Sequence, residues 1–286
     1  MRLWQKYTVS IVVCLLLLLL YINLPLGQNE YEVYGDPLIE KNNILCILIP
    51  YRDRWEELLQ LVPELNRFLN RQHVDHRFIV LNQTDSNRFN RASLINVGWF
   101  EADRLHCTYM VMHDVDLIPL NPDLDYRFPG EGVVRHIAAG AYHPKVRYDY
   151  PKFIGGILML TMHDFKLVNG MSNKYWGWGL EDDEFYLRLR DANLLAALER
   201  PGNLTTGRSD TFKHVHDDKH RKRDQAYIGN QRNLSRTRDR KSGLVSVQYR
   251  IADRRLIKIE DTVVAILDVK LICDKKWTPY CTLKRN

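Results

Sequence analysis

The sequence predicts an α/β fold in which a parallel sheet forms the first half of the folded region. From residue 44 onward, apolar runs of strand length alternate with segments of helical spacing. This order favours parallel strands joined by right-handed crossovers. Hydrophobic residues make up 45% and charged residues 27% of the 286 positions, which is ordinary for a globular protein with a sizeable core. The sequence contains no internal repeat, so a solenoid fold is not indicated.

Spacing and boundary residues predict each element in turn. The first is a continuous apolar run at 44–51, as expected for a strand buried on both faces. The rest of the first half comprises a helix at 55–69, a strand at 77–81, a helix at 92–105 and a strand at 108–115. The second half is irregular and predicts a mixed arrangement, with strands at 156–161, 211–216, 245–249 and 262–271 and a helix at 181–192.

An apolar segment near the N-terminus predicts a membrane anchor. Residues 8–26 carry no charge and include six consecutive leucines, Leu15 to Leu20. The length is at the short end for a spanning helix and would also suit a signal peptide, but no small-residue cleavage site follows. Basic residues precede the segment and acids follow it, which predicts a single-pass type II orientation. The expected organisation is a cytosolic tail at 1–7, a signal anchor at 8–26, a stem at 27–43 and a lumenal domain at 44–286.

Polar side chains follow the first three predicted strands at the point where each strand ends. Parallel α/β sheets bind ligands at the carboxyl ends of their strands, so we expect a nucleotide to bind there. The side chains concerned are Arg52, Arg54, Asn82, Gln83, His113, Asp114 and Asp116.

Two acidic pairs have the spacing of a cation site. Asp114 and Asp116 end a predicted buried strand, where their oxygens can hold a hard cation that in turn binds a diphosphate. Asp123 and Asp125 have the same spacing but fall in a predicted loop. The strand-end pair is therefore the better candidate.

A second candidate for metal binding is His214-Val-His216, the sole His-x-His in the sequence. Alternate side chains of a strand point to one face, so both imidazoles can reach one ion. A lone histidine is usually structural, whereas a pair on one face beside an acidic site favours metal binding. A carboxylate with imidazoles suits Mn²⁺ better than Mg²⁺.

The segment from Trp176 to Glu184 combines tryptophans, glycines and acids. Glycines around Trp176 and Trp178 give a mobile backbone that suits a lid over a sugar. Glu181, Asp182 and Asp183 open a predicted helix, whose dipole should favour their ionised forms. An ionised carboxylate near a lid suits a general base for a sugar hydroxyl. The alternative is helix capping beside a core tryptophan, which applies to Glu181, Asp183 and Trp176.

Cysteines and glycosylation sequons agree with an oxidising compartment. Cys273 and Cys281 bracket a short segment that suits a small disulfide loop. Cys14 falls in the predicted anchor, and Cys46 and Cys107 lie in apolar strand patterns that predict buried thiols. Candidate glycosylation sites are Asn82, Asn203 and Asn233.

Positive charge is concentrated late in the chain. The net charge is +6, and nine Lys or Arg residues against two acids lie between Lys219 and Lys241. The run suits either a solvated helix face or a partner for a diphosphate. No recognised nucleic-acid module frames it, so we do not expect nucleic acid as a partner.

Five motifs, taken together and in order, resemble those of the β-1,4-galactosyltransferase family. The resemblance covers about Ile44 to Cys281. Most members have a Met-x-x-His metal motif, whereas His214-Val-His216 is similar to the branch that galactosylates xylose on proteoglycan cores. The motifs are Phe89-Asn-Arg91-Ala, Asp114-Val-Asp116, Gly155-Gly156, Trp176-Gly-Trp178-Gly and Glu181-Asp182-Asp183.

The resemblance implies a GT-A (Rossmann-like) fold and an inverting transfer of galactose from UDP-galactose to xylose in the Golgi. It implies Mn²⁺ held by Asp116, His214 and His216, with Asp182 as the catalytic base. The implied UDP-galactose site comprises Pro50, Tyr51, Arg52, Asp53, Arg54, Phe89, Asn90, Arg91, Val115, Asp116, Trp178 and Arg223. The implied acceptor site comprises Tyr148, Tyr150, Gly179, Leu180, Glu181, Asp182 and Asp183.

Three alternatives remain open at this point. The same fold could donate galactose or N-acetylgalactosamine to GlcNAc acceptors, although the His-x-His motif counts against a GlcNAc acceptor. A non-catalytic sugar-binding relative would keep the tryptophans without needing Asp182 and a full set of metal ligands. A metal-dependent hydrolase would need an open metal position with an activated water.

Overall fold

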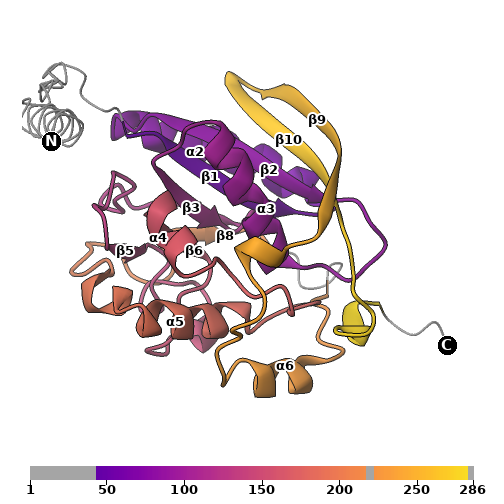
Figure 1. The fold of residues 1–286 in the computed structure, drawn as a ribbon. Coiled ribbons are helices and arrows are strands. Elements are labelled where there is room, and N and C mark those ends of the chain that lie inside the picture. The colour runs from indigo at the N-terminus through magenta and orange to yellow at the C-terminus, as the bar shows by residue number, and fades with distance from the viewer. Residues whose placement is uncertain (1–42, 217–221, 283–286) are drawn as a thin grey trace, which may run out of the picture. The chain divides into compact units, whose positions relative to one another are not determined.

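An eight-stranded mixed sheet forms the centre of the computed structural model, which describes residues 43–216 and 222–282 (Figure 1). The strand order is β7-β5-β6-β3-β1-β2-β10-β9. As predicted, β1 pairs in parallel with both β2 and β3. The bounds are β1 Leu45–Tyr51, β2 His76–Gln83, β3 Tyr109–His113, β5 Val134–His136, β6 Ile157–Thr161, β7 Leu198–Glu199, β9 Tyr249–Ile259 and β10 Thr262–Leu271.

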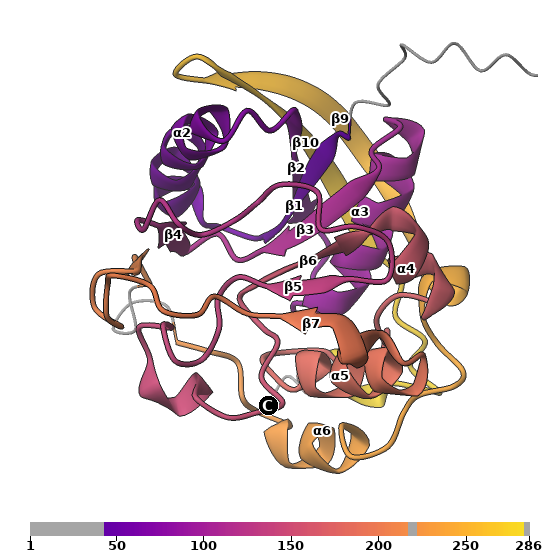
Figure 2. The same cartoon turned by 90° about the vertical axis from the view of Figure 1, so that its left-hand side faces the viewer.

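Helices cover the two faces of this sheet, as Figure 2 shows on either side of the central strands. Helix α2 (Trp55–Arg71) packs Leu58, Leu61 and Leu65 onto the face that carries Ile47. Helix α3 (Arg91–Arg104) and α4 (Met162–Leu167) cover the opposite face. Because both faces are covered, the central strands are apolar on both sides, which explains the continuous run at 44–51.

The remaining elements are short and lie mostly after β3. They are β4 Leu117–Pro119, 3-10 helix η1 Val146–Tyr148, α5 Glu181–Asp191, η2 Leu194–Ala197, β8 Phe212–His214, α6 Ile228–Leu234, η3 Leu244–Ser246 and η4 Pro279–Cys281. Strands β4 and β8 form a separate two-stranded ladder. The predicted mixed second half is confirmed, since β6 runs antiparallel to β3 while β10 runs parallel to β2.

The strand predicted at 245–249 is wrong. Residues Leu244–Ser246 form a 3-10 turn, and β9 begins only at Tyr249. Most side chains of β9 are exposed, because this strand lies at the edge of the sheet. An edge strand with arginines on it lacks the alternating apolar pattern by which buried strands are found in a sequence.

Two disulfides cross-link the described part of the chain. Cys273 is bonded to Cys281, as predicted. Cys46 is bonded to Cys107, which corrects the prediction that these two are thiols. Cys46 lies in β1 and Cys107 just before β3, and those two strands are neighbours in the sheet. The sequence separation of 61 residues hides this proximity.

The predicted tail at 1–7, anchor at 8–26 and nearly all of the stem at 27–43 lie outside the described residues. Among the residues described, no helix has the length and apolarity needed to cross a bilayer.

Candidate active site

A cleft of about 370 Å³ lies where β1 and β3 end. It receives residues from six separate stretches of the chain, and it contains most of the side chains predicted for donor, metal and acceptor. Predicted residues in its lining are Pro50, Arg52, Arg54, Phe89, Arg91, Val115, Asp116, Tyr148, Tyr150, Trp178, Gly179, Leu180, Glu181, Asp182, His214, His216 and Arg223.

The structure brings the three predicted metal ligands together. Asp116 Oδ2 lies 3.2 Å from His216 Nδ1 and 3.8 Å from His214 Nε2. Pairing of β4 with β8 creates this proximity: Leu117 is in register with His214, and the Val215 N–H donates to Asp116 O at 2.9 Å. A ladder of only three residues thus joins segments that are about a hundred positions apart in the chain.

The chemistry of these donors suits a divalent cation. Burial raises the pKa of Asp116, but the hydrogen bond to His216 and the charges of His214 and Arg223 outweigh it, so the net pKa falls below its usual value. Burial lowers the pKa of His214, which keeps its imidazole neutral and able to donate an electron pair.

No closed cage of three His, Cys, Asp or Glu side chains is present among the described residues. Donor atoms of an octahedral site lie roughly 3 Å apart when each is about 2.1 Å from the ion. The separations around Asp116 are close to this value. The side chains of Asp116, His214 and His216 therefore converge at a spacing that fits a Mn²⁺ ion.

Asp114 does not join this set. Its Oδ1 accepts from Arg91 Nε at 2.8 Å, and Arg91 Nη1 also lies 3.7 Å from Glu181. Arg91 starts α3, and Asn90 caps that helix by accepting from Ser93 N at 2.9 Å. Arg91 thus links the strand end to the acidic segment, while Asn90 is buried and does not line the cleft.

Asp182 lies in the first turn of α5 and lines the cleft. A Cβ on Gly155 would lie 2.6 Å from Asp182 Oδ2, so glycine at 155 makes room for the carboxylate. Burial, together with Glu181 and Asp183, raises the pKa of Asp182 well above its usual value. The expectation that the helix dipole keeps this acid readily ionised is therefore wrong: loss of solvent and two acidic neighbours outweigh a dipole contribution of about 0.3–1 kcal/mol.

Trp178 forms a lid between two arginines, Arg147 and Arg223, whose guanidinium carbons lie 5.6 and 5.3 Å from its ring centroid. Gly177 and Gly179 on either side adopt positive φ values of 94° and 97°, a region that glycine reaches without strain. The neighbouring Trp176 is 3% exposed and belongs to the core, which confirms the packing alternative for that residue.

The acceptor side of the cleft carries aromatic rings. Tyr148 stacks on Phe153 with ring centroids 4.9 Å apart, and Tyr150 is 37% exposed. The Tyr150 hydroxyl donates to Asp183 Oδ1 at 3.1 Å. Asp183 is absent from the cleft lining and acts on it through Tyr150. Leu180 adopts a left-handed conformation with φ 72° at the start of α5.

The two arginines on the donor side of the cleft, Arg52 and Arg54, differ in how many protein contacts hold their side chains. Arg52 donates three hydrogen bonds to the backbone oxygens of Gln83, Asp85 and Asn87, so most of its guanidinium holds that loop. Arg54 lies 3.7 Å from Glu57 within α2.

Three predicted donor residues do not reach the lining, namely Tyr51, Asp53 and Asn90. In the late basic run, Lys222 and Arg223 enter the cleft, whereas Arg238 and Arg240 lie 3.4 and 3.9 Å from Asp191 on the surface. Lys222 and Arg223 are therefore the members of the run placed where a diphosphate partner would be needed, while Arg238 and Arg240 form surface ion pairs. Residues 217–221 are outside the described part.

His143 is a cleft residue that the sequence did not reveal. Its ring centroid lies 6.2 Å from that of His214. Burial and the neighbouring His214 lower the pKa of His143 to about 4. Its Nδ1 accepts from Lys145 N at 3.0 Å, which places the proton of the neutral ring on Nε2. No motif surrounds His143, and only tertiary packing brings it here.

The three glycosylation sequons differ in their surroundings. Asn203 and Asn233 are exposed. Asn82 lies in β2, and its Nδ2 donates to Asp268 Oδ1 at 2.8 Å. A glycan on that nitrogen would break a contact inside the sheet, so the structure disfavours Asn82.

A divalent-cation site, arginines beside it and a part-buried acid next to a tryptophan, all lining one cleft at the carboxyl edge of an α/β sheet, define a metal-dependent glycosyltransferase of the GT-A class. Two family models match the chain: the N-terminal region of glycosyl transferase group 7 over residues 34–128 and the N-terminal domain of galactosyltransferase over residues 135–215.

Similar proteins narrow this class. The chain is 53% identical over 278 residues to a xylosylprotein 4-β-galactosyltransferase of Caenorhabditis elegans, covering 96% of this chain and 94% of that protein. It is 48% identical to human β-1,4-galactosyltransferase 7, covering 83% and 71%. A crystal structure of a mutant Drosophila β-1,4-galactosyltransferase 7, titled as a complex with manganese, UDP-Gal and xylobiose, matches at TM-score 0.80 and 49% identity, covering 85% and 100%. This chain belongs to the β-1,4-galactosyltransferase family.

Proposed function

We propose that this protein transfers galactose from UDP-galactose to the 4-hydroxyl of xylose on proteoglycan core proteins, a step of glycosaminoglycan linker synthesis. One observation carries the proposal: Asp116, His214 and His216 converge in the same cleft as Asp182. The names and bound sugars of the relatives support xylose as the acceptor.

The residues divide the reaction between them. Asp116, His214 and His216 would hold Mn²⁺, which when bound supplies positive charge to the departing diphosphate. Arg223 lines the same cleft, where its charge helps to lower the pKa of Asp116, and it adds to the positive charge facing the diphosphate. Trp178 covers the donor sugar and excludes water from its anomeric carbon.

Asp182 is the base. Its raised pKa makes its carboxylate a stronger proton acceptor than an exposed aspartate. It takes the proton of the acceptor 4-hydroxyl as that oxygen bonds to C1 of galactose. The bond from C1 to the UDP oxygen breaks on the opposite face, which inverts the configuration.

A transfer assay tests this function. A fragment that begins at Asn43 keeps all of β1, and with UDP-galactose and Mn²⁺ it should galactosylate a β-xyloside. Incorporation into GlcNAc alone would overturn the acceptor assignment. Loss of activity in chelator, restored by Mn²⁺, is the expected metal control.

The proposed location is the Golgi membrane, with a single-pass type II orientation and a lumenal enzyme. Support comes from the uncharged segment at 8–26 and from two disulfides that need an oxidising compartment. A C-terminal epitope should resist protease in sealed Golgi vesicles and be digested after detergent is added. Digestion without detergent would contradict the orientation.

A further inference from the structure

Arg88 does not line the cleft, yet it contacts the segments that carry two cleft residues. It lies in the loop between β2 and α3, and its side chain is 2% exposed. Its Nε and Nη2 donate to the two carboxylate oxygens of Asp224 at 2.6 and 2.9 Å. A two-point pair between guanidinium and carboxylate fixes orientation as well as distance.

The same guanidinium packs against the tryptophan lid. A Cβ on Gly177 would lie 2.0 Å from Arg88 Nη2, so this approach requires glycine. The backbone oxygen of Asp224 accepts from the Trp178 N–H at 2.8 Å. The pair therefore holds Gly177, which precedes Trp178, and Asp224, which follows Arg223.

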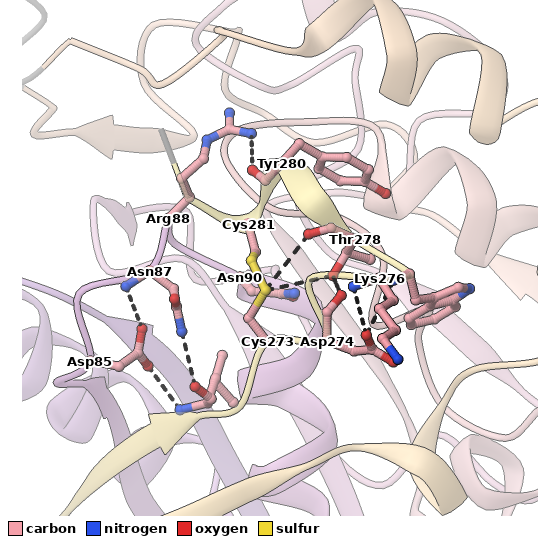
Figure 3. Close-up of a disulfide and its surroundings, with 12 residues drawn as sticks. Asp85, Asn87, Arg88, Asn90, Cys273, Asp274, Lys276, Thr278, Tyr280 and Cys281 are labelled. Carbon is pink, nitrogen blue, oxygen red and sulfur yellow. Dashed lines mark hydrogen bonds between the residues drawn. A yellow bond between two sulfur atoms is a disulfide. The ribbon is translucent and has the colours of Figure 1, made fainter. Parts of the chain in front are cut away.

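On its other side, Arg88 is held by the C-terminal disulfide loop. Its Nη1 donates to Tyr280 O at 3.1 Å, and its backbone N–H donates to Cys281 O at 2.7 Å. Figure 3 shows the arginine next to Tyr280 and the Cys273–Cys281 bond. A disulfide reduces the conformations open to the loop that it closes, so the anchor of Arg88 is itself restrained.

An aromatic ring completes the contacts. The Arg88 guanidinium carbon lies 5.0 Å from the centroid of the Tyr227 ring. The ring centroids of Tyr227 and Tyr280 are 6.2 Å apart. The stretch from Asp224 to Tyr227 is thus gathered around one buried cation. These buried contacts should orient the neighbouring Arg223 more firmly than an ion pair on the surface would, because exposed ion pairs contribute little to stability.

We propose that Arg88 is a positioning residue for the nucleotide sugar: it connects the disulfide loop to Trp178 and Arg223. The inference rests on the proposed function of the cleft. Loss of Arg88 should weaken UDP and UDP-galactose binding. The acceptor rings of Tyr148 and Tyr150 belong to another segment, so the KM for xyloside should change less than the KM for UDP-galactose.

A double-mutant cycle tests the pair. The variants are Arg88→Gln, Asp224→Asn and the two combined, with UDP binding in Mn²⁺ measured by calorimetry alongside the melting temperature. Each single change should weaken UDP binding roughly tenfold, and the combination should be no weaker than the worse single variant. The matched control is Arg255→Gln, which breaks the 2.6 Å pair with Asp268 on the β9–β10 hairpin and should leave UDP binding unchanged.

Two results would overturn the inference: unchanged UDP affinity in folded Arg88→Gln, or fold-changes that multiply in the double variant. Should Arg88→Gln fail to fold, Arg88→Lys carries the same test, since it keeps the charge but loses the two-point pair with Asp224. Calorimetry with UDP needs no acceptor. A parent protein that binds UDP but ignores xyloside would count against the proposed function alone.

A separate experiment tests the role of the loop closed by the Cys273–Cys281 disulfide. In Cys273→Ala/Cys281→Ala, assayed well below its unfolding temperature, the KM for UDP-galactose should rise while that for xyloside stays near the parent value. Adding Arg88→Gln should then change the KM for UDP-galactose little further. An unaltered KM for UDP-galactose in the alanine pair would overturn the role of the loop.

Discussion

At the scale of single residues, immediate neighbours decide the chemistry. Asp114 and Asp116 are two positions apart, but Arg91 binds the first while the second faces two imidazoles. Asp182 shares its helix turn with three other acids, and its carboxylate occupies the space that a side chain at Gly155 would fill. Similar side chains thus acquire different roles from contacts of a few ångströms.

Replacing Asp182 tests the base. Asp182→Asn keeps the shape but cannot accept a proton, so kcat should fall by roughly 10²–10⁴-fold. UDP affinity should stay at the parent value, because the metal ligands are intact. Steady-state kinetics with a β-xyloside and calorimetry with UDP measure the two effects. Turnover at the parent rate would show that another group is the base.

The same variant tests the burial of Asp182 through stability. The pKa of Asp182 in the folded protein is raised, so its ionised form destabilises the fold at pH values above that pKa, and the penalty disappears below the usual aspartate value of about 3.9. Asp182→Asn should therefore melt at a higher temperature than the parent at pH 8. This difference should shrink as the pH falls to 4. A constant difference across the series would contradict the raised pKa.

Removing a proposed metal ligand should change the metal requirement. For His214→Ala, we expect the Mn²⁺ concentration at half-maximal activity to rise roughly tenfold or more. His163→Ala is a matched control, because His163 is exposed and is not among the residues that line the cleft. An unaltered Mn²⁺ titration of His214→Ala would exclude His214 from the coordination shell.

At the scale of elements, short pieces of backbone assemble the site. The β4–β8 ladder has three residue pairs, yet it places the histidines opposite Asp116. Similarly, α5 begins directly after the glycine-flanked Trp178, so the positions of Trp178 and Asp182, which are four positions apart in the chain, are coupled. Neither element has enough apolar area to be stable alone, and both depend on the large sheet beside them.

Breaking the ladder should act like losing a ligand. Val215→Pro removes the N–H that donates to Asp116 O at 2.9 Å. We expect weaker Mn²⁺ activation, by roughly tenfold, and a lower melting temperature. Val215→Thr is the matched control, since it keeps the N–H and the branched shape. Equal Mn²⁺ titrations for the two variants would show that this hydrogen bond does not position the ligands.

At the scale of the whole molecule, two disulfides restrain the described chain, one within the central sheet and one near its C-terminal end. The Cys46–Cys107 bond links β1 to the entry of β3, and Cys273–Cys281 closes the C-terminal loop beside Arg88. The former spans 61 positions and the latter 8. They therefore restrain the unfolded chain to different degrees.

Unfolding in denaturant should reveal that difference. In the chain-entropy account, loss of the longer link should lower the free energy of unfolding by roughly 4 kcal/mol, against roughly 2.5 kcal/mol for the shorter one. Cys46→Ala/Cys107→Ala and Cys273→Ala/Cys281→Ala are matched pairs for this comparison. A larger loss from the shorter link would show that native contacts, such as those to Arg88, outweigh loop entropy.

The sequence by itself determined the α/β class, the parallel strands at the start of the fold and the types of side chain that reach the cleft. Buried strands and amphipathic helices show a local periodicity of apolar residues in the sequence. Polar residues at the end of a predicted strand, such as Asp116, can therefore be assigned to the ligand-binding edge of the sheet before their tertiary contacts are known.

Only the tertiary structure decided the rest. The Cys46–Cys107 bond, the entry of His143 into the cleft, the raised pKa of Asp182 and the contacts of Arg88 join residues far apart in the chain or depend on burial. The physical reason is that packing sets both proximity and solvent exposure, and neither leaves a periodic signal in the order of residues.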